Sequence, residues 1–294
     1  MKNLYAFDGV ILGYASLLSG VVLAFRPPGW AIYLGYHGLV AILIVLLAWA
    51  HRRFGGRFWT FCRYWYVVPI VLASFRELHY LVPQVHPFDD HRYDRLLADL
   101  DRRWFGDVDA FFLSFHPLAM DVLHACYWFY FPSILLPGGI LYARGDWTVL
   151  RRYITVILTG FYVSYLGYLL VPAIGPHHFY PSRPAVLDGW ILGRHAHAAI
   201  LAMEWRMPDA FPSGHTLMSL LVLCLSWRPL RGFFWAALGP ASGCVLATVA
   251  LRYHYVVDVL ASVALLPAVL WAGHALHRAW ERELSAKAVR NPRG

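Results

Sequence analysis

The amino-acid sequence predicts an all-α, polytopic membrane protein: a bundle of about eight transmembrane helices with an amphipathic interfacial helix. Hydrophobic residues make up 59% of the 294 residues and charged residues only 14%, whereas soluble domains average roughly 25% charged. The mean hydropathy is +0.50, and the apolar residues fall in long blocks. This composition excludes an ordinary cytosolic enzyme, a disordered chain and a secreted disulfide scaffold.

Eight apolar blocks are candidates for membrane-spanning helices, because a helix needs about 20 residues to cross ~30 Å of hydrocarbon. The third and fourth blocks are the least regular. The third contains Arg76 and Glu77, which we expect to form a structural pair within the membrane. The blocks run over residues 8–25, 30–50, 60–83, 117–142, 151–171, 211–227, 232–251 and 255–277.

Arginine clusters after alternate helices predict the orientation of the bundle. Short Arg-rich loops stay in the cytoplasm, so this face and both termini are expected there. The formal net charge is +8, but no basic stretch with interleaved aromatic residues resembles a nucleic-acid surface, and we expect no nucleic-acid partner. The clusters contain Arg52, Arg53, Arg57, Arg144, Arg151, Arg152, Arg228, Arg231, Arg278, Arg282, Lys287, Arg290 and Arg293.

Two long segments, 84–116 and 172–210, lie between apolar blocks on the opposite face. The first mixes aspartates and arginines with apolar residues near helical spacing, which predicts one amphipathic helix at the membrane interface. We expect this helix to lie across the mouth of any site on that face. The second segment is rich in proline, glycine and histidine and is expected to form an ordered loop over the outer face.

The sequence Pro212-Ser213-Gly214-His215 stands where an apolar block begins. Proline and serine at this place are helix start signals, and Ser213 is the expected N-cap. The first turn of a helix exposes unpaired N–H groups and a positive dipole end, which favour a phosphate group. A histidine in that turn is placed to donate a proton to the bound group.

A second polar motif contains His254 and Asp258 at the start of the last apolar block. Residues four apart share one face of a helix. A carboxylate there can hold one imidazole nitrogen as N–H and leave the other as a nucleophile. One helix out and one helix back separate His215 from His254, so we expect both histidines on the same, extracytoplasmic, face.

Together these motifs resemble the second and third motifs of the type 2 phosphatidic acid phosphatase (PAP2) superfamily. The segment from Tyr93-Asp94 to Trp104-Phe105-Gly106 is similar to the inositol phosphorylceramide synthase-like branch. The resemblance covers about residues 90–275. With the apolar blocks, it predicts four regions: N-terminal transmembrane helices at 1–83, an amphipathic interfacial segment at 84–116, a PAP2-like catalytic transmembrane core at 117–277 and a cytoplasmic tail at 278–294.

The resemblance also implies residue roles. His254 would be the nucleophile that attacks phosphorus, Asp258 would orient it, and His215 would protonate the leaving oxygen. A phosphohistidine route of this kind implies no metal and no cofactor. The residues expected to bind phosphate are Ser213, Gly214, Arg252 and Arg183.

The sequence departs from the superfamily pattern at two positions where a positively charged residue is expected. The first motif, Lys-x6-Arg-Pro, is missing: Arg183-Pro184 would be its end, but Pro176 occupies the lysine position. The third motif usually has arginine six residues before its histidine, where this chain has Thr248. Candidate substitutes are Arg252, Arg183, Arg194 and Arg206.

The departures favour a phospho-headgroup transferase over a simple phosphatase, with lipid phosphate hydrolysis as the alternative and transport along embedded charges as a remote one. The expected partners are a phospholipid donor, a lipid or polyol acceptor and the bilayer. We expect the protein in a bacterial inner (plasma) membrane.

The loop histidines have no assisting cysteine or clustered carboxylate, so we expect surface residues rather than metal ligands. They are His177, His178, His195 and His197.

Overall fold

The computed structural model describes residues 4–86, 91–180, 182, 184–203 and 208–290. This part of the chain is helical throughout, without a strand, which confirms the predicted all-α class. The elements in chain order are α1 (Ala6–Phe25), α2 (Trp30–Phe54), α3 (Gly56–Trp65), α4 (Val67–Val85), α5 (Arg92–Phe105), α6 (Val108–Leu113), α7 (Pro117–Trp128), α8 (Tyr130–Arg144), α9 (Trp147–Leu170), α10 (Pro176–Phe179), the short 3-10 helix η1 (Ala185–Asp188), α11 (Leu192–Met203), α12 (Gly214–Ser226), α13 (Arg231–Ala250) and α14 (Val256–Arg290).

Among the described residues, six helical stretches are long and apolar enough to cross a membrane. They are α1, α2, α3 with α4, α9, α13 and most of α14. The expected span 117–142 is wrong, because the chain bends at Phe129 and forms α7 and α8. The expected span 211–227 is shorter than predicted: Ser213 caps α12, which has 13 residues and covers only about 20 Å.

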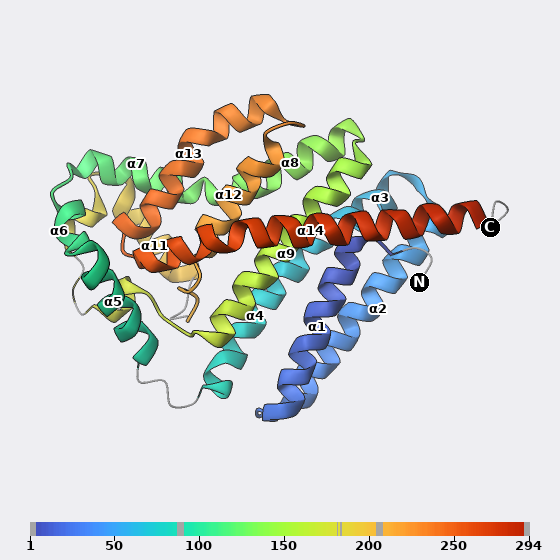
Figure 1. Ribbon diagram of the computed structural model, residues 1–294, viewed down its shortest axis with the longest axis horizontal. Coiled ribbons are helices and arrows are strands. Elements are labelled where there is room, and N and C mark those ends of the chain that lie inside the picture. The colour runs from blue at the N-terminus through green and yellow to red at the C-terminus, as the bar shows by residue number, and fades with distance from the viewer. Residues whose placement is uncertain (1–3, 87–90, 181, 183, 204–207, 291–294) are drawn as a thin grey trace.

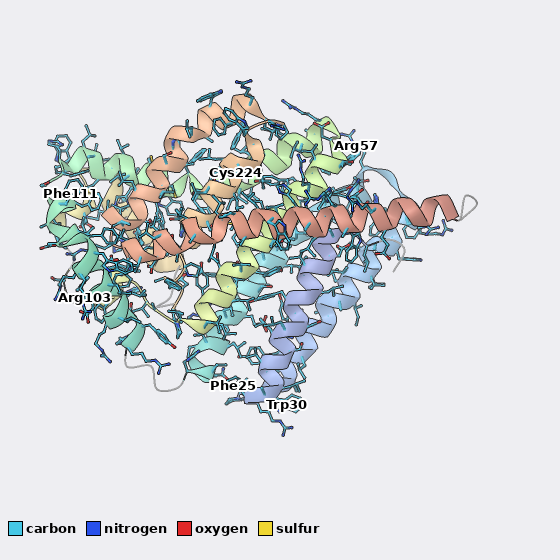
Figure 2. The ribbon with its side chains drawn as sticks, in the orientation of Figure 1. Phe25, Trp30, Arg57, Arg103, Phe111 and Cys224 are labelled. Atoms are coloured by element: carbon cyan, nitrogen blue, oxygen red, sulfur yellow. The ribbon has the colours of Figure 1, made fainter. Side chains whose placement is uncertain are left out.

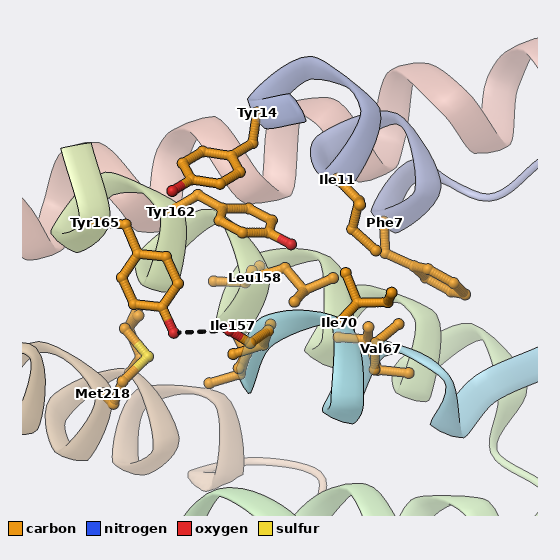
Figure 3. Close-up of a cluster of buried hydrophobic side chains, with 14 of the residues drawn as sticks. Phe7, Ile11, Tyr14, Val67, Ile70, Ile157, Leu158, Tyr162, Tyr165 and Met218 are labelled. Carbon is orange, nitrogen blue, oxygen red and sulfur yellow. Dashed lines mark hydrogen bonds between the residues drawn. The ribbon is translucent and has the colours of Figure 1, made fainter. Parts of the chain in front are cut away.

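The central helix of the bundle is α9, which contacts α1, α4, α8, α12 and α14. Figure 1 shows α14 crossing in front of this group, with the two termini at the same end of the molecule. Figure 3 shows the core around α9, where Tyr162 stacks on Tyr14 at 4.1 Å and Tyr165 donates a hydrogen bond of 3.2 Å to the carbonyl of Val71.

Large apolar side chains cover the outward faces of these helices. Ile32 and Trp271, for example, are 78% and 72% exposed, and Figure 2 shows Phe25 and Trp30 at the tip between α1 and α2. A soluble protein rarely exposes contiguous apolar patches of this extent, whereas lipid tails solvate them. The protein is an integral membrane protein.

Two buried polar networks hold the N-terminal helices together. On α3, the Arg63 guanidinium pairs with Asp8 of α1, which also accepts a hydrogen bond from Tyr66. Deeper in the bundle, His37 lies 2.7 Å from both Ser19 Oγ and Glu77 Oε1. The expected pairing of Glu77 with Arg76 is therefore wrong: neighbouring residues on α4 point to different sides, and Glu77 is buried against His37 while Arg76 is exposed.

The segment 84–116 contains the predicted helix as α5, followed by the short α6. Its aspartates are not all solvated, and some accept hydrogen bonds from other parts of the chain. Asp101 accepts hydrogen bonds from the backbone N–H groups of Val256 and Val257, at 2.7 and 3.0 Å, and so caps the start of α14. The segment 172–210, expected as a loop, instead contains α10, η1 and α11, because Asp121 of α7 accepts the N–H groups that begin α11.

Candidate active site

His215 lies in the first turn of α12. The predicted cap is confirmed: Ser213 Oγ accepts the N–H of Thr216 at 3.3 Å. Position 214 needs a glycine for a steric reason, because a Cβ there would collide with the Tyr168 hydroxyl of α9. The helix N-terminus is thereby pressed against α9, and His215 is fixed beside it.

His254 stands in the tight turn between α13 and α14, two residues before Val256, where the helix in which we had expected it begins. The turn forms because Arg252 adopts a positive φ of 65°. The carbonyl of Thr248 then accepts both Tyr253 N–H and His254 N–H, at 2.9 and 2.8 Å. These bonds fix the backbone on which the buried His254 ring is mounted.

The His254 ring donates to a backbone carbonyl. Its Nδ1 lies 2.8 Å from the carbonyl oxygen of Ala210 and 3.5 Å from Asp258 Oδ2. A carbonyl oxygen can only accept, so Nδ1 carries the hydrogen in this arrangement. The neutral ring then presents the lone pair of Nε2, as a nucleophilic histidine must.

Asp258 lies in the first turn of α14 and is fully buried. Its Oδ2 accepts the N–H of Tyr255 at 2.8 Å, so the carboxylate also ties down the turn before α14. Its backbone carbonyl accepts the N–H of Ser213 at 3.3 Å, and Ser262 Oγ donates to both residues' carbonyls. The two sequence motifs are therefore joined directly through their backbones.

The two histidines face one another, with ring centroids 5.8 Å apart. Both rings line the same cavity, so one group bound there can contact both of them. Tyr127 and Tyr130, on either side of the bend at Phe129, lie 4.4 and 4.2 Å from the His215 ring. The bend brings both tyrosines onto His215 and holds its orientation.

A cavity of about 440 Å³ opens from the histidines and continues between α4, α8 and α9. Its far end is formed by Tyr64, Trp65 and Leu150. Leu72 and Leu135, on the two sides of the cavity, are 62% and 43% exposed, so the cavity reaches the outer surface of the bundle between α4 and α8. The remaining walls are almost entirely apolar and aromatic, which suits a lipid chain.

Sequence reasoning missed three residues that line this cavity: Asp209, Arg76 and His177. Burial raises the pKa of Asp209 to about 6, and the nearby His254 partly offsets this rise. His177, which we expected at the surface, begins α10 and packs its ring against Tyr253 at 5.1 Å. Only the position of Asp209, close before the Pro-Ser-Gly-His motif, offered a signal in the sequence.

Of the four predicted substitute cations, the two within the described residues, Arg252 and Arg194, do not line the cavity. Arg252 donates a 3.0 Å hydrogen bond to the carbonyl of Ser182 and so holds the segment after α10. Arg194 is exposed on α11. Arg183 and Arg206 lie outside the described residues.

Asp94 of α5 contacts the backbone segments next to the site. It accepts N–H groups of Ile174 and Gly175 at 3.1 and 3.0 Å and the Tyr255 hydroxyl at 3.1 Å. Burial raises the pKa of Asp94, although these hydrogen bonds oppose the rise. The described residues that line the cavity include none from α5, so α5 supports the turns around the site rather than covering the mouth of this cavity.

The fold and site define an integral membrane protein with two facing histidines at helix ends and a lipid-sized apolar cavity. A family model described as the PAP2 superfamily matches residues 95–272, more than half of the chain, and the chain belongs to this superfamily. Its members are generally phosphatases or phosphotransferases that act on lipid phosphates. No curated protein and no solved structure shows a significant match to this chain.

Proposed function

We propose that this protein transfers a phospho group from a lipid donor to a hydroxyl acceptor through a phosphohistidine at His254. The observation that carries the proposal is the hydrogen bond from His254 Nδ1 to the carbonyl of Ala210. It sets the tautomer in which Nε2 is the nucleophile, on the ring that faces His215 across 5.8 Å.

The reaction follows in two balanced halves. Nε2 of His254 attacks phosphorus, the bond from phosphorus to the lipid oxygen breaks, and His215 gives its proton to that oxygen. The acceptor hydroxyl then attacks phosphorus, its proton passes to His215, and the bond from phosphorus to Nε2 breaks. Asp258, 3.5 Å from Nδ1, stabilises the positive charge that the His254 ring carries in the intermediate.

The start of α12 and the cavity-lining cations support the binding of phosphate. The first turn of α12, which Ser213 and Gly214 begin, is the positive end of a helix dipole and favours an anion. Arg76 lines the same cavity and supplies a positive charge in place of the missing first motif, and the His177 ring lies beside the cavity as a further polar group. Arg252, which the sequence suggested for this role, holds the neighbouring segment instead.

The open side of the cavity supports a lipid substrate that enters from the bilayer. Exposed Leu72 and Leu135 flank the opening, at the depth where lipid chains lie. A chain that lies between α4 and α8 would leave its phosphate next to His254. Because α4 precedes the matched family region, the N-terminal helices would supply one wall of the substrate site.

Asp209 favours the inositol phosphorylceramide synthase-like reaction over hydrolysis. A carboxylate in the cavity accepts hydrogen bonds from the hydroxyls of a polyol or lipid acceptor, and an apolar cavity that opens toward lipid limits competing water. Water as acceptor would give a lipid phosphate phosphatase. This alternative uses the same residues except Asp209.

The test uses reconstituted protein with a labelled phospholipid donor, with and without an added lipid or polyol acceptor. We expect the label to move to the acceptor, and the variant Asp209→Asn to lose transfer more than hydrolysis. The control Asp188→Asn, in η1, removes a carboxylate outside the cavity and should change neither. Release of free phosphate alone, whatever acceptor is added, would leave only the phosphatase.

The same assay tests the metal requirement. A phosphohistidine route needs no divalent ion, so activity should survive EDTA, and vanadate should inhibit as a mimic of five-coordinate phosphorus. Loss of activity on chelation, with recovery on adding a divalent ion, would contradict this route.

Sidedness also belongs to the proposal. The arginine clusters favour an extracytoplasmic site in a bacterial inner membrane. In a cysteine-free background, the variant Ser182→Cys places one thiol on the exposed segment beside Arg252. An impermeant maleimide should label it from outside intact cells. Labelling only after the cytoplasmic face is opened would reverse the orientation.

A further inference from the structure

A second cavity lies between α9 and α14, far from the histidine pair. Its volume is about 240 Å³. Four of its six lining residues are basic, and none is a carboxylate. The lining residues are Thr148, Val149, Arg152, His274, His277 and Arg278.

The cavity stands at the other end of the transmembrane bundle. His274 follows Val256, the first residue of α14, by 18 residues, which is about 27 Å along a helix. That is close to one hydrocarbon thickness, so the cavity and the histidine pair lie at opposite membrane faces. Gly273 allows the close packing beside it, since a Cβ there would lie 2.9 Å from Val156 of α9.

One buried polar atom in this cavity has no partner in the protein. The side chain of His277 is only 5% exposed, and its Nδ1 makes no hydrogen bond. Glu281, one turn further along α14, accepts a 2.9 Å hydrogen bond from Arg151 and does not line the cavity. Arg152 and Arg278 therefore face a cavity whose described lining residues include no carboxylate.

We propose that this cavity binds a phosphate group, either of an anionic lipid headgroup or as free phosphate. Two guanidiniums in a small cavity repel one another unless an anion lies between them, and phosphate is the anion that arginine binds in two-point fashion. The unpartnered imidazole of His277 supplies a further hydrogen bond. Basic pockets between transmembrane helices at a cytoplasmic face are suited to lipid headgroups.

The test compares the wild type with the double variant Arg152→Gln, Arg278→Gln. The matched control, Arg144→Gln with Arg231→Gln, removes two exposed arginines outside this cavity. One arm titrates inorganic phosphate into protein in neutral detergent. The other measures phosphatidylglycerol retained from phosphatidylcholine nanodiscs that contain it, by native mass spectrometry. Both arms are repeated with His215→Ala, so that binding at the histidine pair is recognised separately.

We expect binding by the wild type, the control and His215→Ala, and at least about twentyfold weaker binding by the double variant, since each arginine near an anionic headgroup contributes about fivefold. Binding of inorganic phosphate would identify free phosphate; binding of phosphatidylglycerol alone would identify a lipid headgroup. If the double variant does not fold, the exposed Arg278→Gln alone should bind about fivefold more weakly. No binding by the wild type, or equal binding by all variants, would overturn the proposal.

Discussion

His254 Nδ1 lies closer to the backbone carbonyl of Ala210, at 2.8 Å, than to the carboxylate of Asp258, at 3.5 Å. The backbone just before the Pro-Ser-Gly-His motif therefore sets the tautomer of the histidine in the following motif. Since the same carbonyl remains in any Asp258 variant, orientation of the ring and stabilisation of its charge are separable functions in this site.

The first prediction separates these functions. The variant Asp258→Asn should lower kcat/KM by much less than the about 10⁴-fold lost when the orienting aspartate of a Ser-His-Asp triad is replaced, because the Ala210 carbonyl still holds the tautomer. His254→Ala should abolish turnover. Steady-state kinetics on the reconstituted protein measure both, with circular dichroism to confirm that each variant is helical.

A loss in Asp258→Asn as complete as that in His254→Ala would mean that the Ala210 carbonyl does not hold the productive tautomer. The account would then have to assign the orienting role to the carboxylate.

The second prediction uses the pKa of Asp209, which burial raises to about 6 from 3.8. A raised pKa means that the folded state holds the proton more tightly, so the stability it contributes is complete below about pH 4 and is lost as pH rises through 6. The variant Asp209→Asn removes this loss and should be more stable than wild type above pH 6, by up to about 3 kcal/mol. Thermal unfolding in detergent measures the difference.

The pH-dependent part of the difference should level off only well below pH 3.8, where the wild-type carboxyl is protonated in both states. An Asn variant that is equally stable or less stable than wild type at pH 7.5 would show that Asp209 is not held in a costly charged form.

The third prediction concerns the far end of the cavity. The variant Val68→Trp should fill space between α4 and α9 and shorten the room for a chain. Excluding two methylene groups forfeits about 1.6 kcal/mol of apolar burial, so KM for a long-chain donor should rise roughly tenfold, with little change for a short-chain donor.

The control Leu46→Trp adds the same bulk to an exposed position of α2, outside the cavity. Equal KM changes for long and short donors in Val68→Trp would show that the chain does not lie in this cavity.

The fourth prediction concerns Asp101, which caps α14 from α5. The variant Asp101→Ala leaves two N–H groups without their acceptor and should lower the free energy of unfolding by about 1–2 kcal/mol. Because α14 carries Asp258, kcat should fall as well. The neighbouring Asp99 is exposed on the same helix, and Asp99→Ala should leave both unchanged. Equal effects of the two variants would contradict the capping role.

The sequence predicted the helical class and the meeting of His215 and His254 for a clear physical reason. Apolar blocks of membrane-crossing length can be recognised as helices in the sequence alone. A chain that runs out along one helix and back along the next returns to its starting face. The cap by Ser213 was predicted because it depends only on neighbours in the chain. Local patterns of this kind are visible without tertiary structure.

Other features depend on contacts that the sequence does not show. The break at Phe129 has a local proline signal, because Pro132 cannot donate to the carbonyl of Trp128, but its contact with the distant His215 is not visible in the sequence. Glu77 contacts His37, which is 40 residues away in the chain, and not its neighbour Arg76. Asp209 lines the cavity because the backbone of its neighbour Ala210 lies beside His254. Each of these results from packing between helices rather than from periodicity.

The most direct test of the central claim is the site of the covalent intermediate. Protein mixed with a donor labelled in its phosphate is quenched within the first turnover, digested and mapped by mass spectrometry under conditions that preserve the acid-labile bond. The account predicts one phosphohistidine, at His254, and none in His254→Ala. Label on His215, or full turnover by His254→Ala, would contradict it.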